Sequence, residues 1–468
     1  MPVPVISVEE MRAWERATWN QGITELEVID QVGQAIADWI KPNLKQDGRI
    51  LILAGKGHNG DDGKAAASHL PNGVSIVIEI TDPATALAHV EGEIKQRPSL
   101  IVDCLFGIGL NRPLSQAWCE LIERINRSRL SIVSIDVPSG LNAQTGTFKG
   151  ACIQADHTLT IGAPKTGMIV AAAQKSVGYI RTLSNVGLAA PPRGSNLFFT
   201  EEKDFEQFPP RKRAQDHKGS LGHLTIVAGS PGYHGAAVLA ARAATRAQAG
   251  LITLETMEAC YFPVAAQLQQ VMTRVWDPGW ISSTRATGIL VGPGLAAASL
   301  SPQLTEQVGA LWQQAKSPIV VDASALDWIP KGETDSSSSR MITPHPGEAA
   351  RLLNCTAKDI EKDRLQSLRE LSSTYGNCWV VLKGTHTLVG RAEGPVYANA
   401  TGNPGLAQGG SGDVLAGLIG GLIAQPRCQK DLERALRLAV WQHGKAADKL
   451  QTASNNWTIE ELPDAISI

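Results

Sequence analysis

An aspartate directly follows a glycine-rich stretch of the sequence, and the two together could transfer a phosphoryl group. The stretch reads Asn403-Pro-Gly-Leu-Ala-Gln-Gly-Gly-Ser-Gly-Asp413, and the apolar run 414–423 behind it predicts a buried helix. The first N–H groups of a helix lack partners and carry the positive end of its dipole, so the amides of residues 410–412 would stabilise a phosphoryl group in transfer. A carboxylate repels phosphate, and Asp413 is therefore predicted to accept the proton of an attacking hydroxyl.

A simple helix cap is the competing interpretation of Asp413. Four glycines among the eight residues 405–412 are an unfavourable way to build a cap, because each glycine loses backbone entropy on folding. We therefore favour the catalytic interpretation. The stretch is not a P-loop, since Asp-Val follows the last glycine where a P-loop needs Lys and then Ser or Thr.

A second glycine-rich loop lies in the first third of the chain. The apolar run 49–54 leads into Gly55-Lys-Gly-His-Asn-Gly-Asp-Asp-Gly63, and the sequence resumes as a helix over residues 64–70. Strand, glycine loop and helix form the nucleotide-binding unit of doubly wound folds, whose ligands lie at the carboxyl ends of the strands. The loop therefore predicts a nucleotide site.

Two aspartates end neighbouring predicted strands in the same part of the chain. Asp103 and Asp136 would both lie at the edge of the sheet where ligands bind. With Asn59 and Ser139, Asp103 offers the hard oxygen ligands that suit a monovalent or divalent cation rather than zinc. For either aspartate alone, capping of the following turn is an equally good interpretation.

Later strand candidates also end in polar or glycine loops. Residues 224–228, 288–291, 318–322, 341–343 and 378–383 predict strands, and a helix is expected over 236–249. We expect the loops to meet at one edge of a sheet beside residues 409–413; they read Gly292-Pro-Gly-Leu295, Asp322-Ala-Ser-Ala-Leu326, Thr343-Pro-His-Pro-Gly-Glu348 and Lys383-Gly-Thr-His-Thr387. His345 stands between two prolines that present it rigidly, and it is predicted to contact the substrate.

The composition limits the class of protein. A chain of 468 residues with 43% hydrophobic and 19% charged residues is expected to form two or three globular domains. The net charge of −2, without a long basic run, argues against nucleic acid as a partner. No stretch of about eighteen apolar residues suggests a membrane span, and the start Met1-Pro-Val-Pro-Val does not resemble a signal peptide, so we expect a cytoplasmic protein. Its seven scattered cysteines are expected to be reduced thiols.

The elements that must position these residues are predicted from hydrophobic periodicity. Residues 6–45 are expected to be helical, and strands are expected at 49–54, 74–80, 100–103, 132–136 and 158–161, alternating with helices. That alternation predicts a parallel sheet between helices, an α/β fold. The Pro- and Gly-rich residues 189–195 and the polar residues 201–215 mark a linker, so we place the domains at 1–200 and 205–468.

The carboxyl-terminal motifs, taken in order over residues 205–455, resemble the ADP/ATP-dependent NAD(P)H-hydrate dehydratases of the ribokinase-like fold. The resemblance implies that ADP or ATP, with Mg²⁺, is the phosphoryl donor. It implies that four residues face the hydrated nicotinamide dinucleotide, namely Ala237, Gly294, His345 and Asp413. It implies that the adenine nucleotide is held by Lys383, Gly384, Thr385, His386, Thr387 and Gly412.

The amino-terminal loops, including Gly162-Ala-Pro-Lys-Thr-Gly167, resemble the NAD(P)H-hydrate epimerases, which implies a Rossmann-like three-layer domain. The resemblance implies K⁺ binding by Asn59, Asp103 and Ser139, and acid–base chemistry at C6 by Asp136 and Lys165. It also implies that the substrate is bound by His58, Asn59, Gly60, Asp61, Asp62, Gly107, Ile108, Gly109, Leu110, Asn111, Arg112, Pro113 and Asp136.

The sequence therefore predicts a fused enzyme, expected to be a homo-oligomer, that repairs hydrated NADH and NADPH (NADHX and NADPHX). One domain would interconvert the R and S epimers at C6, and the other would dehydrate the S form. One alternative is a ribokinase-like small-molecule kinase. In another, the amino-terminal domain is a non-catalytic module for nucleotide sensing or oligomerisation, because His58 and Asp61 depart from the family loop and Asp61 adds a charge that would repel a phosphate.

Overall fold

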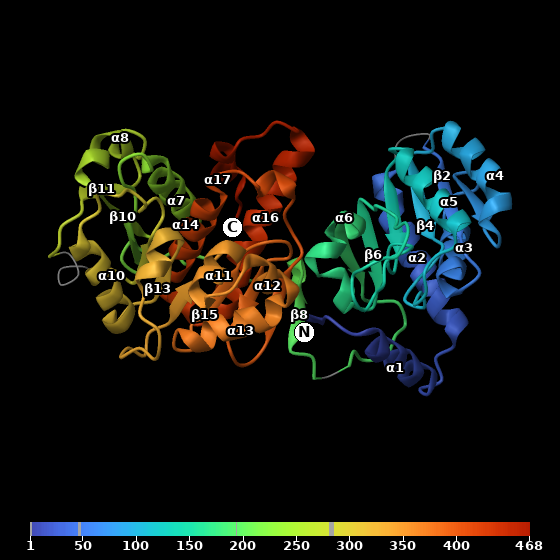
Figure 1. Cartoon of the computed structure of the whole chain (residues 1–468), viewed down its shortest axis with the longest axis horizontal. Helices are drawn as coiled ribbons and strands as arrows, with labels where there is room; N and C mark the ends of the chain where they lie inside the picture. Colours follow the sequence, from blue (N-terminus) through green and yellow to red (C-terminus); the bar gives the residue numbers. More distant parts are fainter. Residues whose placement is uncertain (1, 45–47, 193, 280–284) are drawn as a thin grey trace. The chain divides into compact units, whose positions relative to one another are not determined.

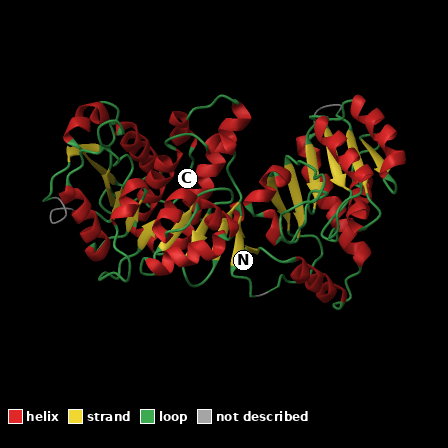
Figure 2. Ribbon diagram, in the orientation of Figure 1, coloured by secondary structure: helices red, strands yellow, loops and turns green. Residues whose placement is uncertain are grey.

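The computed structural model describes residues 2–44, 48–192, 194–279 and 285–468 (Figure 1). The chain forms two compact units, Val3–Phe199 and Thr200–Ile468, and Figure 2 shows that both are built of strands between helices. The boundary falls just after the predicted linker 189–195, of which Arg193 lies outside the described residues.

The amino-terminal unit is built around a six-stranded parallel sheet of strand order β3-β2-β4-β5-β6-β7. The strands are β2 (Ile50–Ala54), β3 (Ser75–Glu79), β4 (Leu100–Cys104), β5 (Ile132–Ile135), β6 (His157–Ile161) and β7 (Tyr179–Leu183). The helices are α1 (Val8–Trp19), α2 (Glu25–Asn43), α3 (His58–Ser68), α4 (Pro83–Lys95), α5 (Gln116–Arg127) and α6 (Gln174–Val177). Two further strands, β1 (Val3–Pro4) and β8 (Leu197–Thr200), pair antiparallel.

Alternate residues of these strands are buried on opposite faces of the sheet, as a strand's two-residue period requires. On β2, Ile50 and Ile52 belong to a core with α2 and α3, whereas Leu51 and Leu53 belong to a second core with α4 and α5. The sheet is therefore the middle of three layers, and the predicted strands and their parallel pairing are confirmed.

Two predictions about helices need correction. The expected helix over 6–45, whose last residue lies outside the described part of the chain, is interrupted: Ser7 and Thr24 each form a capping box, so α1 and α2 are separate. The glycine loop is shorter than predicted, because α3 already begins at His58 instead of residue 64. Its glycines serve close packing: a Cβ on Gly60 would lie 2.0 Å from the Gly55 carbonyl oxygen.

The carboxyl-terminal unit contains a mixed sheet of strand order β17-β16-β15-β14-β13-β12-β9-β10-β11. Its strands are β9 (His223–Val227), β10 (Leu251–Thr256), β11 (Met272–Val275), β12 (Gly288–Val291), β13 (Ile319–Val321), β14 (Arg340–Ile342), β15 (Trp379–Leu382), β16 (Leu388–Gly390) and β17 (Val396–Asn399). β16 pairs antiparallel with β15 and β17, and the other pairs are parallel. All five strands predicted in this half of the chain are present.

Helices cover this sheet. They are α7 (His234–Arg246), α8 (Tyr261–Ala265), α10 (Pro302–Gln314), α11 (Pro346–Leu353), α12 (Ala357–Lys362), α13 (Arg364–Thr374), α14 (Ser411–Ile423), α15 (Pro426–Gln429), α16 (Leu432–Ala453) and α17 (Leu462–Ala465). The predicted buried helix is α14, which packs closely on α7: a Cβ on Gly417 would lie 2.0 Å from the Ala240 carbonyl oxygen. Among the described residues, no helix is both long enough and apolar enough to cross a membrane.

Candidate active sites

A cavity of about 670 Å³ opens at the carboxyl edge of the amino-terminal sheet. Most of the residues predicted to bind substrate line it, including His58, Asn59, Asp62, Asp136 and every residue from 107 to 112. Gly60, Asp61 and Pro113 are not among the lining residues. The glycine loop, the loop after β4 and the end of β5 therefore meet at one cavity, as the sequence predicts.

The two residues that depart from the family loop point away from this cavity or lie at its edge. The Asp61 carboxylate pairs with Lys64 at 2.6 Å, and both side chains are over a third exposed. His58 contributes to the cavity wall, but its exposed imidazole lies 2.8 Å from the Glu25 carboxylate on α2. Because Asp61 is neutralised outside the cavity, its charge is no obstacle to a dinucleotide there.

Behind the cavity, the predicted cation ligands form one cluster. Asp103 is fully buried and accepts hydrogen bonds from the Ser139 hydroxyl (2.6 Å), the Ser139 amide (2.9 Å) and the Ser134 hydroxyl (2.7 Å). Burial raises the pKa of Asp103 above its ordinary value, although these hydrogen bonds act in the opposite direction.

One oxygen in this region has no hydrogen-bond partner among the described residues. The Asn59 amide nitrogen donates to the Phe106 carbonyl at 3.0 Å, but its buried Oδ1 accepts no hydrogen bond from that part of the chain. The Ser139 hydroxyl lies 3.4 Å from the same Phe106 carbonyl. Carbonyl, amide and hydroxyl oxygens are the ligands of hard cations, so this set fits K⁺. No group of three or more His, Cys, Asp or Glu residues that could hold a metal occurs in the described part of the chain.

Asp136 and Lys165 form a buried ion pair. The Lys165 side chain is fully buried and also donates to the Thr160 hydroxyl and the Ile161 carbonyl, each at 3.0 Å. Asp136 has a backbone φ of 64°, in the left-handed region that costs energy for a residue other than glycine. The strained turn presents the Asp136 carboxylate to the cavity in front while Lys165 holds it from behind.

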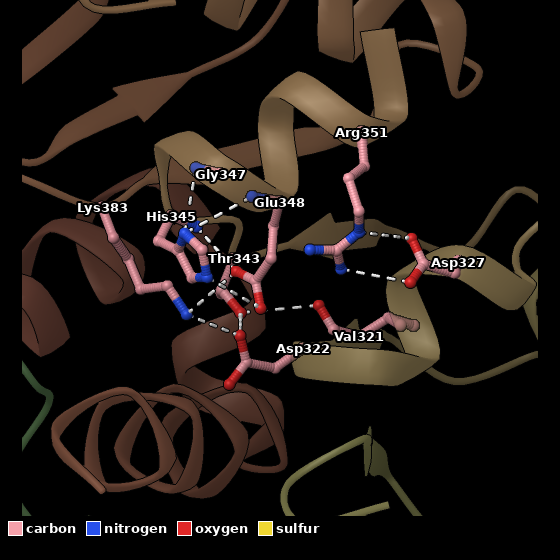
Figure 3. A network of polar contacts seen from close by, with 9 residues as sticks. All are labelled: Val321, Asp322, Asp327, Thr343, His345, Gly347, Glu348, Arg351 and Lys383. Atoms are coloured by element: carbon pink, nitrogen blue, oxygen red, sulfur yellow. Dashed lines mark hydrogen bonds and ion pairs between the residues drawn. The ribbon is translucent and has the colours of Figure 1, made fainter. Parts of the chain in front are cut away.

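In the carboxyl-terminal unit, acidic side chains from two strand-end loops surround one lysine (Figure 3). The Lys383 ammonium lies 2.9 Å from Asp322 Oδ1 and 3.6 Å from Glu348 Oε2, and the Thr343 hydroxyl donates to the same Asp322 oxygen at 2.6 Å. Burial would lower the pKa of Lys383, but these carboxylates outweigh it and raise the pKa above its ordinary value. Three of the four predicted loops thus meet at one edge.

Asp413 lies in the first turn of α14, which begins at Ser411 after Gly410 with its φ of 96°. Burial, and then the charge of Asp322, raise the pKa of Asp413 to about 7, although Lys383 acts in the opposite direction. The side of Gly412 faces the same lysine, because a Cβ there would lie 3.2 Å from the Lys383 ammonium. A carboxyl that titrates near neutrality at a helix N-terminus can act as a general base.

His345 performs a structural task at its predicted position. Its Nδ1 accepts hydrogen bonds from the amides of Gly347 (3.0 Å) and Glu348 (3.4 Å), so the side chain caps α11. Since Nδ1 is an acceptor, a neutral His345 carries its proton on Nε2, which is half-exposed and lies 3.6 Å from Glu348 Oε1. That N–H is the group with which His345 could contact a substrate.

The loop from Lys383 to Thr387 is held in place by a buried arginine. Arg364, at the start of α13, donates to the carbonyls of Leu382 (3.0 Å), Lys383 (3.2 Å) and Thr385. Within the loop, Thr387 donates to the Gly384 carbonyl at 3.0 Å. His386 contacts the Asn399 carbonyl, and burial lowers its pKa to about 4, so its imidazole is neutral near pH 7.

The two remaining predicted substrate residues lie close to each other. A Cβ on Gly294 would lie 2.4 Å from the Tyr233 carbonyl and 2.9 Å from Ala236, so the loop after β12 packs against the start of α7. The Ala237 side chain is fully buried in the core, which leaves only its backbone for contact with a ligand.

Sequence reasoning missed Asp322 and Glu348 as parts of the site, and it missed Arg364 altogether. Asp322 could have been found, because it directly follows a buried apolar run just as Asp103 and Asp136 do. Nothing in the local sequence distinguishes Arg364 from an exposed helical arginine.

Comparison with known proteins identifies relatives of both units. A family model described as NAD(P)H-hydrate dehydratase matches residues 224–467, and one described as YjeF-related protein N-terminus matches residues 25–89 and 78–167. The bifunctional NAD(P)H-hydrate repair enzyme of Coxiella burnetii is 31% identical over 94% of this chain and 93% of its own. The enzyme of the same name from Escherichia coli is 33% identical, over 96% and 90%.

A solved structure shows the fold. A ribokinase-like superfamily protein from Enterococcus faecalis matches with a TM-score of 0.51 and 22% identity, covering 59% of this chain and 96% of its own. The predicted ribokinase-like fold is confirmed.

Proposed function

This chain belongs to the family of bifunctional NAD(P)H-hydrate repair enzymes, and on that premise we propose which part of the chain performs each half of the repair. Residues 1–200 interconvert the R and S epimers of NADHX and NADPHX at C6. Residues 205–468 dehydrate the S form to NADH or NADPH.

The dehydration is proposed to proceed through phosphorylation of the C6 hydroxyl. Hydroxide is a poor leaving group and phosphate a good one, so transfer of a phosphoryl group prepares the elimination. Asp413 takes the proton from the C6 hydroxyl, and the amides at the start of α14 stabilise the charge that develops on the phosphoryl group. The observation that carries this proposal is the Asp413 carboxyl, whose pKa of about 7 suits a base at neutral pH.

ADP or ATP is the proposed donor, held by the loop from Lys383 to Thr387 and by Gly412. The Lys383 ammonium is compensated by Asp322 and Glu348, so a nucleotide meets a site in which the charges are already paired. Mg²⁺ usually binds through one or two carboxylates and the substrate phosphates. Asp322 and Glu348 are the carboxylates available for it, and bound Mg²⁺ would neutralise charge on the transferring phosphoryl group.

For the epimerase half, Asp136 and Lys165 are the proposed acid–base pair, and Asn59, Asp103 and Ser139 the proposed K⁺ site. The unpartnered Asn59 Oδ1 supports the cation, because a bound K⁺ would satisfy it. The cation would order the loops that form the cavity.

A cytoplasmic location and self-association are also proposed, to be tested by cell fractionation and sedimentation.

The test is recovery of dihydronicotinamide absorbance from a mixture of (R)- and (S)-NADHX, with ADP, with ATP and with neither. We expect complete recovery with a nucleotide, faster than spontaneous epimerisation allows. A plateau once the S form is consumed would contradict the epimerase half, and no nucleotide-dependent recovery would contradict the dehydratase half. Accumulation of a stable phosphorylated product would instead support a small-molecule kinase.

A further inference from the structure

The cavity of the amino-terminal unit contains more acid groups than the pair Asp136 and Lys165 requires. Glu15 from α1 and Asp62 from α3 line the same cavity as Asp136. Asn59 and Asp62 are three residues apart on α3 and lie on the same face of this helix. That face is the one that lines the cavity.

Asp62 differs from its neighbours because it is buried without a counter-ion. It is 5% exposed, and no hydrogen bond or ion pair joins its carboxyl to another described residue. Burial, and then the charges of Asp136, Asp61, Glu15 and Glu25, raise its pKa well above the ordinary value. A buried carboxyl near other acids and without an ion-pair partner binds its proton more tightly than an exposed carboxyl, and Asp62 lies where it can offer a proton to a ligand in the cavity.

The chemistry of the substrate calls for such a group. In the hydrated cofactor, C6 carries a hydroxyl and is bonded to the ring nitrogen N1. The N1 lone pair can form a C6=N1 double bond as the C6–O bond breaks, but hydroxide leaves poorly unless an acid protonates it. The planar C6 that results can be attacked by water from either face, which interconverts the R and S forms.

We propose, on the basis of the epimerase function proposed above, that Asp62 is the acid that protonates the departing C6 hydroxyl. The C6–O bond breaks, its electron pair and the Asp62 proton leave as water, and N1 becomes a cationic iminium nitrogen. Water then adds to the opposite face of C6, the C=N electrons return to N1, the added water loses a proton to the solvent, and the Asp62 carboxylate takes up a proton from the solvent. No net oxidation occurs.

The rest of the cavity suits that intermediate. The iminium cation would form beside the carboxylates of Asp136 and Glu15, which line the cavity and stabilise positive charge. The ion pair with Lys165 holds the Asp136 carboxylate at this position. Thus one carboxyl donates a proton and the others stabilise the charge that the donation creates.

The test uses the full chain and pure (R)-NADHX. We expect D62N, which keeps the shape of the side chain but has no acidic proton, to lower kcat for epimerisation by about 10²- to 10⁴-fold with little change in KM. The dehydratase activity of the same chain, assayed with (S)-NADHX, should be unchanged, and an unchanged denaturation midpoint of the amino-terminal unit shows that this unit of the variant is folded. E123Q removes an exposed carboxylate from α5 and is the matched control.

A second measurement tests the bond that breaks. Epimerisation in H₂¹⁸O should place ¹⁸O at C6 in step with inversion, whereas opening and closing of the ring would retain the original oxygen. Retention of that oxygen, or full epimerase activity in D62N, would overturn the proposal while leaving the epimerase function intact. Absence of epimerisation by the unaltered chain would instead overturn the function itself.

Discussion

The two units each present an aspartate and a lysine at the carboxyl edge of a sheet, but they pair them differently. In the amino-terminal unit, Lys165 binds the functional carboxylate Asp136 directly. In the carboxyl-terminal unit, Lys383 binds Asp322 instead, and the functional carboxylate Asp413 has no such bond among the described residues. The direct pair holds the carboxylate and the ammonium against each other. The indirect arrangement leaves Asp413 free to gain and lose a proton near neutral pH.

Replacing Asp413 should have the largest effect and should sharpen this contrast. In D413N the base is lost, so we expect nucleotide-dependent dehydration of (S)-NADHX to fall by about 10²- to 10⁴-fold. Epimerisation measured on the same preparation should be unchanged. An equal loss of both activities would mean that the two sites are not independent.

Replacing Lys165, the cation of the ion pair with Asp136, should lower the stability of the amino-terminal unit. Lys165→Met leaves the Asp136 carboxylate buried without its partner, which costs about 3–5 kcal/mol for pairs of this kind. We expect the amino-terminal unit to unfold at lower denaturant while the transition of the other unit stays in place, as followed by hydrogen exchange. If the variant is as stable as the parent, the pair does not hold Asp136 as described.

The hydrogen bonds of Ser139 with Asp103 and with the Phe106 amide should contribute less to stability than the ion pair of Lys165 and Asp136 does. Ser139→Ala removes one hydroxyl donor from buried Asp103 and the acceptor of the Phe106 amide, and we expect a loss of about 1–3 kcal/mol. Chemical denaturation measures it, with Ser128→Ala, just after α5 and only partly buried, as the control. A loss no larger than in the control would show that Ser139 contributes little to the cluster.

The pH dependence of dehydration gives the smallest effect and the most direct test of the contrast. The base must be ionised, so the rate should rise with pH through about 7 and fall tenfold for each unit below it. Asp322→Asn removes a negative charge that raises the pKa of Asp413, so the rise should move to lower pH. A shift to higher pH would show that the freed Lys383 no longer faces Asp413.

The predicted strands were found because each is a short apolar run followed by a polar or glycine residue, whereas β7, β10, β11, β16 and β17 were not predicted. The start of α3 was not predicted either, because His-Asn-Gly-Asp-Asp-Gly has little preference for helix, and packing against α2 and β2 decides its conformation. The sequence could not show whether His345 caps a helix or contacts a substrate. The cap depends on how His345, Gly347 and Glu348 are placed in the folded chain. The sequence did predict that the loops around Lys383 meet, but it could not give the contacts of Lys383 with Asp322 and Glu348, which are far apart in the chain.

The buried guanidinium of Arg364 has a consequence for how a nucleotide binds. A free loop must lose conformational entropy when it closes on a ligand, and that loss weakens the affinity. Arg364 already fixes three carbonyls at this loop, so its shape is set before any ligand arrives. The loop should therefore change shape little when a nucleotide binds. The affinity should then depend mainly on how well the nucleotide complements the loop.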